Sequence, residues 1–535
     1  MGWSNAFLTE INSPTRSPVW ALEAIRLLSG GVGGERDYTS HMVVGSGYSP
    51  HLKIGSVRTG GARLNPLSWT STQGAFSVEL FGDVSDILLY YSRGTVVRLM
   101  LGFEGWDPSQ FQPVGLGVVK NVRGSPPKWS LECWDLVQAL QNRITDDATK
   151  LELFYGVGTQ TELSSAHAVG VATVQVDDAS GFSKESTAVG RNGYGLLYIT
   201  PNLDEGISTV EEPFYLRYSD APDESANEFT DVEADDLLGT TAGIVPIDST
   251  VDEVAYIEGH PMESLAKILT STGVTDYNGA FDTLPVSWGY GLPKELVDTD
   301  DIELMKTAFY VAAGIRYEYS MVSHEPQSNG LQWIQSQLSG AGIFLTQRQG
   351  QLTARVVQDP NGTEAEPVTS GLEIGDSDIM GVAYEAWDSQ QPAEYDIWNI
   401  NYHGAAASGI PYDAALPDEE VQTLPVALSY ESFAAIDVDH DHAADMITEV
   451  SKRLKYWYWR VAERLTLTCA GLRLAQLCPG DIVTITSKIL YGRGEAKTGT
   501  SLGFEGRRAM VYGVDPDWIG GTVTVIIAIL PDYGD

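Results

Sequence analysis

The sequence predicts a mainly β, multi-domain protein with a few helices (β+α). Many short segments alternate apolar and polar residues, and 55 glycines and 25 prolines supply frequent turns between them. A length of 535 residues exceeds what one hydrophobic core can fill. We expect four domains: a β-domain at 1–155, an inserted small β-barrel at 156–258, an α+β domain at 259–375 and a C-terminal β-domain at 376–535.

The first region reads as a set of strands that ends in a helix. AFSVELFG and TVVRLMLGF alternate apolar residues from Phe76 and from Val97, and FQPVGLGVVKNV predicts one more strand. KWSLECWDL alternates as far as Cys133. Asp135 can then cap the free N–H groups of a helix that begins with DLVQALQNR.

The second region is expected to be an insertion built from strands. VATVQVDDASGF, GYGLLYITP, PFYLRYSD and STVDEVAYI each predict one strand, and a helical pattern returns at Pro261. Residues 200–260 hold 16 acidic side chains against Arg217 alone, a net charge of −15. Residues 1–150 hold 13 acidic and 13 basic residues, so the net charge of −39 lies entirely in 151–535. Such a surface repels a polyanion, which disfavours a dedicated DNA- or RNA-binding protein.

The third region mixes helices with a hairpin. Helices are expected in PMESLAKILTSTGV, with Gly273 as C-cap, in DDIELMKTAF and in NGLQWIQSQLSGAG. IFLTQRQGQLTARVV predicts a hairpin that turns at Gln349-Gly350. A further helix is expected over Asp439–Tyr456.

The C-terminal module begins with a strand that places Leu465, Leu467 and Cys469 on one face. Pro479-Gly480 supplies a tight turn before the strand DIVTITS. After a polar excursion over 491–506, two more strands, RRAMVYGVDPDW and TVTVIIAIL, are joined at Gly520-Gly521.

The order of these stretches resembles the tail-tip (baseplate) hub proteins of long-tailed bacteriophages. Three stretches carry the likeness in order: the Trp-x-Leu-x-Cys strand that leads into an Asp-Leu helix, the helix–hairpin pair ending in G-x-F-L-x-x-x-x-G-x-L-x-x-R, and the C-terminal strand, Pro-Gly-Asp turn and hairpin. A fourth lies in the insertion, at Thr173, Val176, Asp178, Gly181, Phe182, Phe229, Val232, Gly239, Thr240 and Ala242. The resemblance implies that 1–155 and 259–375 are tube-type hub domains and that 376–535 completes the hub.

The same resemblance implies a virion structural protein at the distal end of the tail, made in the host cytoplasm. Such a protein closes the tail tube, holds the end of the tape-measure protein and connects the tube to host-recognition fibres. Its implied partners are two further copies in a homotrimer, the distal tail protein or tail tube ring, the tape-measure protein, and a tail fibre or receptor-binding protein. No catalytic residue, cofactor, metal, specific nucleic acid or stable membrane insertion is expected.

Several residues have the chemistry of a catalytic or metal-binding site. Cys133, Cys469 and Cys478 form no C-x-x-C pair, and burial in apolar strands is preferred for all three, although Cys133 precedes a helix as a nucleophile would. The sequence contains no P-loop, H-E-x-x-H, G-x-S-x-G or EF-hand pattern. No secretory signal or membrane-spanning run is visible either, so we expect a soluble protein.

The residues Asp437, Asp439, His440, Asp441 and His442 have metal-ligand chemistry, but a role at a helix N-terminus is preferred. The aromatic run over Lys455–Arg460 suits nucleobase stacking, yet core packing is preferred. The other histidines pair with nothing visible in the sequence: His41, His51, His167, His260, His324 and His403.

The alternative function is a secreted or surface β-protein that binds or cleaves a polysaccharide. It accounts for 13 tryptophans and 25 tyrosines. It accounts less well for the missing signal peptide and for the mixed third region.

Overall fold

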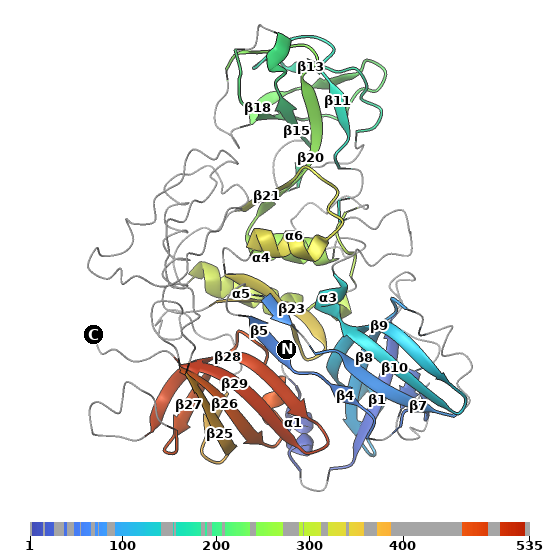
Figure 1. Ribbon diagram of the computed structural model, residues 1–535, viewed down its shortest axis with the longest axis vertical. Helices are drawn as coiled ribbons and strands as arrows, with labels where there is room; N and C mark the ends of the chain where they lie inside the picture. The colour runs from blue at the N-terminus through green and yellow to red at the C-terminus, as the bar shows by residue number, and fades with distance from the viewer. Residues whose placement is uncertain are drawn as a thin grey trace.

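The computed structural model describes residues 3–13, 16–25, 37–39, 48–53, 55–65, 70–72, 74–82, 91, 93–140, 153–154, 157–182, 188–189, 195–205, 209–235, 242–270, 288–292, 294–311, 319–338, 342–357, 372–386, 463–490 and 503–529. Over these residues the chain is mainly β, with several sheets and five α-helices, which confirms the predicted fold class. Two sheets lie side by side at one end, helices pack above them, and the insertion projects from the other end (Figure 1).

The first region forms an eight-stranded sheet in the order β3-β2-β1-β8-β9-β10-β7-β4. Its strands are β1 (Pro18–Ile25), β2 (Asp37–Thr39), β3 (Tyr48–Ser49), β4 (Arg58–Thr59), β7 (Phe76–Phe81), β8 (Val96–Phe103), β9 (Gln112–Ser125) and β10 (Lys128–Asp135). A 3₁₀ turn, η1 (Pro108–Gln110), separates β8 from β9. The predicted helix is confirmed as α3 (Leu136–Ala139), and the Asp135 carboxylate accepts from the Val137 N–H at 2.6 Å.

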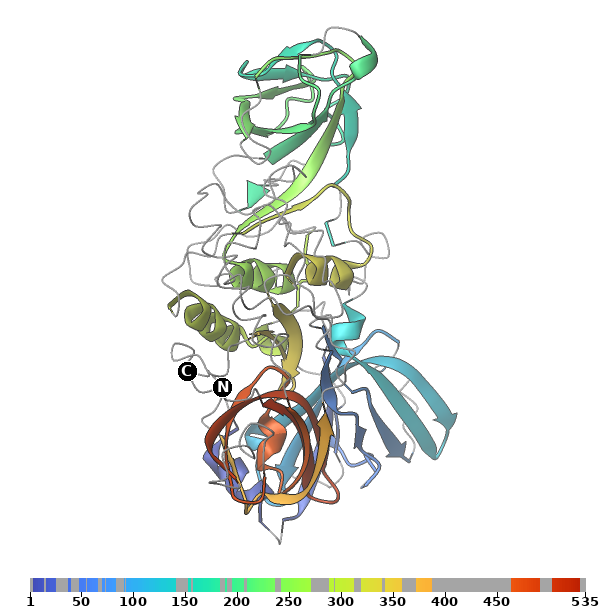
Figure 2. The ribbon, with the colours of Figure 1, turned by 60° about the vertical axis from the view of Figure 1, so that its left-hand side comes forward.

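The C-terminal module forms a second curled sheet in the order β24-β27-β28-β29-β26-β25 (Figure 2). Its elements are β24 (Glu373–Gly375), β25 (Ile379–Ala386), β26 (Glu463–Ala470), the 3₁₀ turn η8 (Arg473–Gln476), β27 (Ile482–Ser487), β28 (Phe504–Asp517) and β29 (Thr522–Ile529). The predicted strands and both turns are confirmed, and Leu465, Leu467 and Cys469 point into the core.

Two segments of the first region pack on the C-terminal sheet. Strands β5 (Ala62–Asn65) and β6 (Thr70–Thr72) pair with each other, and β5 also pairs with β28. The N-terminal helix α1 (Asn5–Ile11), which the sequence analysis did not predict, begins after Ser4, whose side chain accepts from the Phe7 N–H. The two ends of the sequence therefore share one core.

The third region packs between the two sheets and the insertion. Its elements are α4 (Pro261–Thr270), η4 (Lys294–Leu296), α5 (Thr299–Val311), β21 (Tyr319–Ser323), α6 (Gly330–Leu338), β22 (Ile343–Arg348) and β23 (Gln351–Val356). All three predicted helices and the hairpin are confirmed. Every residue of α4 is buried, including Glu263 and Lys267, so this helix is enclosed on all sides rather than on one face. Gly273 and 439–456 lie outside the described residues.

The insertion has its own core. A central sheet runs in the order β11-β20-β15-β16-β18, and two ribbons, β12-β19 and β13-β17, pair separately. The elements are β11 (Gln160–Glu162), β12 (His167–Ala168), β13 (Thr173–Gln175), β14 (Ala188–Val189), β15 (Gly195–Thr200), η2 (Leu203–Glu205), β16 (Phe214–Tyr218), β17 (Glu228–Thr230), β18 (Glu233–Asp235), β19 (Ile244–Val245) and β20 (Thr250–Gly259).

The β13–β17 ribbon adjoins the end of β11, where the Asp177 N–H donates to the Glu162 carbonyl at 2.9 Å and the Ser164 N–H donates to the Gln175 carbonyl at 3.1 Å. The central sheet and the ribbons enclose one core. Strand β20 continues downward to pair with β21, and so connects the insertion to the body (Figure 2).

Candidate functional site: a buried ionic junction

One face of the β22–β23 hairpin is mainly polar, with Phe344 opposite Arg355 as its apolar member, and the other face is mainly apolar apart from Gln347. Antiparallel partners point to the same side of a ladder, so Thr346 and Thr353 share the polar face with Arg348 and Arg355. The opposite face, which includes Leu352, packs into the largest hydrophobic core. The turn at Gln349-Gly350 has positive φ at both residues, 50° and 71°, as a two-residue hairpin requires.

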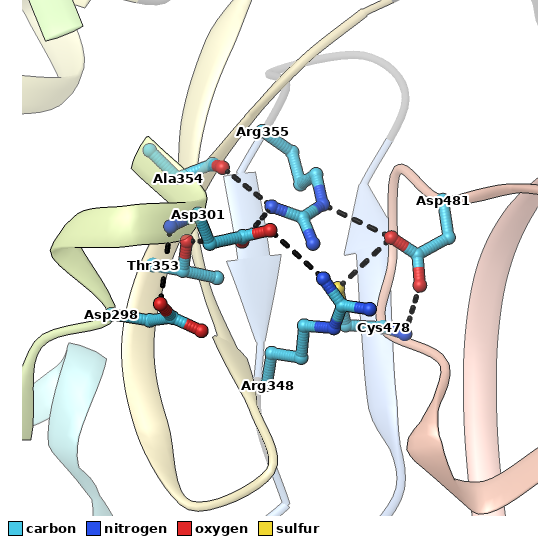
Figure 3. A network of polar contacts seen from close by, with 8 residues as sticks. All are labelled: Asp298, Asp301, Arg348, Thr353, Ala354, Arg355, Cys478 and Asp481. Carbon is cyan, nitrogen blue, oxygen red and sulfur yellow. Dashed lines mark hydrogen bonds and ion pairs between the residues drawn. The ribbon is translucent and has the colours of Figure 1, made fainter. Parts of the chain in front are cut away.

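Helix α5 supplies the first carboxylate of the site. Asp298 precedes the helix, and its side chain accepts from the Asp301 N–H at 3.1 Å, which fixes the first turn. The Asp301 side chain then points toward the polar face of the hairpin (Figure 3).

The Pro479-Gly480 turn supplies the second carboxylate. Gly480 has φ +91°, and a Cβ there would lie 2.7 Å from Phe344 Cζ and 2.8 Å from Arg355 Cβ. Only glycine fits this turn without displacing the hairpin. The turn is held by the Asp481 carboxylate, which accepts from the Cys478 N–H at 3.0 Å.

The two carboxylates and two guanidinium groups meet in one network (Figure 3). Arg355 donates from Nε to Asp481 Oδ1 at 3.0 Å and from Nη1 to Asp301 Oδ2. Arg348 donates to Asp301 Oδ1 at 2.8 Å, and the Thr353 hydroxyl donates to Asp301 Oδ2 at 2.7 Å. The side chains of Arg355 and Asp481 are 0% exposed, so the pair is fully removed from solvent.

The opposite charges in this network stabilise one another. Burial raises the pKa of Asp301, but the adjacent Arg355 and Arg348 outweigh it and hold that pKa below its usual range. The carboxylates Asp301 and Asp481 hold the pKa of Arg355 well above its usual value against the opposing effect of burial. Asp301, Arg348 and Arg355 therefore remain charged inside the protein, where each depends on its partners.

Further polar contacts extend this junction to the first region. Ser71 of β6 donates to the Thr346 hydroxyl at 3.3 Å, and Gln347 of β22 donates to the Asp135 carboxylate at 3.2 Å. The ionic junction, defined as Asp301, Arg348, Thr353, Arg355 and Asp481, thus lies where the first, third and C-terminal regions meet.

All three cysteines are free thiols in buried positions. Each is buried, and burial raises the pKa of Cys133 and Cys478 and brings that of Cys469 to about 12. A thiol whose pKa is raised holds little of the reactive thiolate at neutral pH. The preferred reading of these residues as core side chains is confirmed.

His260 forms a second polar contact that sequence reasoning missed. It precedes α4, and its Nδ1 accepts from the Met262 N–H at 3.2 Å, the role of an N-cap. Burial, assisted by Lys306, lowers the pKa of His260 from 6.5 to about 3. The folded protein therefore holds this imidazole neutral.

The pH dependence of stability follows from His260. Its folded pKa lies below the unfolded value, so the unfolded chain binds the proton first and stability falls as pH drops below about 6.5. At pH 4.5 the loss should be about 3 kcal/mol. We expect H260N, which can keep the cap, to lose less stability between pH 7.5 and 4.5 in urea unfolding. Parallel pH profiles for the two proteins would contradict this assignment.

His324 lies at the joint between insertion and body. Its Nε2 is 2.9 Å from the Tyr215 hydroxyl, and its ring meets that of Tyr198 at 4.4 Å between centroids. Burial lowers the pKa of His324 and raises that of the neighbouring Asp252. The contact braces the insertion's sheet against the chain that follows β21.

Other candidate residues are not brought together. The described part of the chain contains no group of three or more His, Cys, Asp or Glu that could hold a metal ion. Asp437, Asp439, His440, Asp441, His442 and Lys455–Arg460 lie outside the described residues. Within the described ranges, no helix is both long and apolar enough to span a membrane.

Comparison with known proteins finds similarity among solved structures only. No family model matches the chain, and no curated protein matches it. A tail protein from Neisseria meningitidis MC58 is 10% identical, with 96% of this chain and 97% of that chain covered and a TM-score of 0.35. The 43 kDa tail protein of prophage MuSo2 from Shewanella oneidensis is 10% identical, with 97% and 99% covered and a TM-score of 0.32.

A chain of the virion of a native gene transfer agent particle is 13% identical, with 47% of this chain and 84% of that chain covered and a TM-score of 0.19. Two of these three solved structures are described as tail proteins, and the third is a chain of a virion.

Proposed function

We propose that this chain is the tail-tip hub of a bacteriophage, a virion structural protein that closes the distal end of the tail tube and acts without catalysis. One observation carries the proposal. The arginine that ends the hub-like hairpin pattern, Arg355, pairs at a buried position with Asp481 of the hub-like Pro-Gly-Asp turn. Two stretches that each resemble a hub protein thus contact each other, and they join the third region to the C-terminal region.

The proposal extends to assembly. The two tube-type domains, 1–155 and 259–375, would let three copies present six similar units to a sixfold tube. The ring would hold the tape-measure end, contact the distal tail protein and present its outer surface to fibres or receptor-binding proteins. A closed ring also covers the edges of β-sheets, which would otherwise be free to pair with other chains.

Immunogold labelling of particles with antibodies against this chain tests its location. We expect gold at the distal end of the tail. Labelling of the capsid or along the whole tube would refute the hub assignment. Particles that carry C133S should assemble and infect normally, whereas loss of a glycan-degrading activity in that variant would show that the protein is an enzyme.

The insertion should be dispensable for folding of the body. Its core cluster contains only residues between Leu163 and Val251, and Glu162 lies opposite Thr250 in the ladder. Replacing 163–249 by Asn-Gly should close a hairpin there. We expect a soluble body with a lower thermal midpoint, because Leu196 and Tyr215 no longer cover Val254 and Tyr256 of β20. An insoluble or unfolded product would show that the insertion is integral to the body.

A further inference from the structure

The end of the insertion remote from the body exposes apolar side chains. Eleven large apolar residues are exposed in the described residues, and four belong to the insertion. We define the apolar tip as these four: Leu203 (59% exposed), Val171 (49%), Ile244 (43%) and Ile247 (40%). Helical turn η2, which holds Leu203, lies at the far end of the molecule (Figure 1).

Backbone contacts place these residues on neighbouring segments. The Asn202 N–H donates to the Ser249 hydroxyl at 3.0 Å, which brings η2 beside the segment that holds Ile247. Ile244 lies opposite Ala168 in the β12–β19 ribbon, and the Val171 N–H donates to the Ala168 carbonyl at 3.0 Å. The four residues therefore come from adjoining turns.

The apolar tip is not needed to fill the insertion's core. The inward positions of the same segments are already occupied, by Val245 of the ribbon, by Ile199 before η2 and by Val210 after it. Several outward apolar side chains grouped at one end of a projecting domain are typical of a protein contact surface.

Exposed carboxylates lie next to the tip residues in the chain. Asp204 and Asp248 are exposed and adjoin Leu203 and Ile247 in the chain, and Glu211 and Glu212 are exposed beside Val210. Residues 200–260 carry a net charge of −15. A second copy of this chain, a nucleic acid or an anionic membrane would be repelled from such a rim, whereas a basic protein surface would be attracted.

We propose that the apolar tip docks a partner protein whose contact surface is apolar at its centre and rimmed by lysine or arginine. Burial of the apolar side chains would stabilise the complex. The acidic rim would favour a basic partner over an acidic one and would orient it. This inference goes beyond the hub assignment and does not rest on it, because the tip can be tested on the purified full-length chain.

The test measures binding of a labelled amphipathic peptide of leucine and lysine, with a peptide of leucine and glutamate as the charge control. We expect the full chain to bind the lysine peptide and to bind it less tightly as the ionic strength rises from about 0.05 to about 0.5 M. The L203N/I247N variant should bind at least about fivefold more weakly. Both substitutions are at exposed positions, and an unchanged thermal midpoint will confirm that the variant is folded.

A matched variant, I489N/I519N, alters two exposed isoleucines of the C-terminal module and should bind within about twofold of the unaltered chain. Equal binding by L203N/I247N and the unaltered chain would overturn the proposal, because attraction by charge alone would then suffice. Equal binding of the glutamate peptide would overturn the role of the acidic rim.

Discussion

Replacing Arg355 by methionine should destabilise the protein by about 3–5 kcal/mol. The change leaves Asp301 and Asp481 buried, and Asp481 loses its only arginine partner among the ion pairs of the described residues. Burying a charge without its partner costs far more than the intact pair contributes. Urea unfolding followed by tryptophan fluorescence measures the loss, and hydrogen exchange at 480–482 and 352–356 locates it.

A matched arginine separates this effect from the loss of any ion pair. Arg217 bonds Glu233 on the insertion, where the carboxylate side chain is 68% exposed. R217M should therefore cost less than about 1 kcal/mol. The double variant R355M/D481N removes both charges of the buried pair and should lose less stability than R355M alone. An R355M protein within about 1 kcal/mol of the unaltered chain would show that the ionic junction contributes little.

Gly480→Ala should produce the second large effect. Its Cβ would press on both Phe344 and Arg355 in a backbone conformation that disfavours any side chain. Strain of about 1–2 kcal/mol and overpacking of about 1–3 kcal/mol should add. Because the turn carries Asp481, hydrogen exchange of the backbone amides in the ionic junction should become faster as well.

The control for this variant is Gly105→Ala. Gly105 has φ +83°, close to that of Gly480, but a Cβ there would meet nothing within 4 Å. G105A should show the backbone strain alone, about 1–2 kcal/mol. Thermal unfolding of both variants measures the difference, and equal shifts would mean that the close approach of turn and hairpin has no energetic weight.

Local patterns predicted the elements whose causes are local. Alternation located β7–β10 and β26–β29, Asp135 capped its helix, and Gln349-Gly350 set the hairpin turn. Alternation did not predict β1 or the short strands β2–β6. The same rules could not recognise α1, a short helix whose stability comes from packing: Phe7 meets Phe103 at 5.5 Å between ring centroids. Nor could amphipathicity reveal that α4 is enclosed on all sides, where Glu263 pairs with Lys306 of α5.

The ionic junction was beyond sequence reasoning for a different reason. Arg355 and Asp481 are 126 residues apart, and nothing near either residue specifies the other. Arg355 was nevertheless an unusual residue, a charge in a strand whose other positions are mostly apolar or small. Buried arginines require partners, so the one charged residue of β23, whose positions are almost all buried, was the available signal. The crossing of β5 to the C-terminal sheet gave no such signal.

Native mass spectrometry of the purified full-length chain tests the hub assignment most directly. If each chain holds the two tube-type domains proposed for it, a closed ring with a mass of three times 58.0 kDa is expected. The ring should persist at physiological ionic strength. A stable monomer, or a ring of six copies, would contradict the argument that three chains supply six tube-type units.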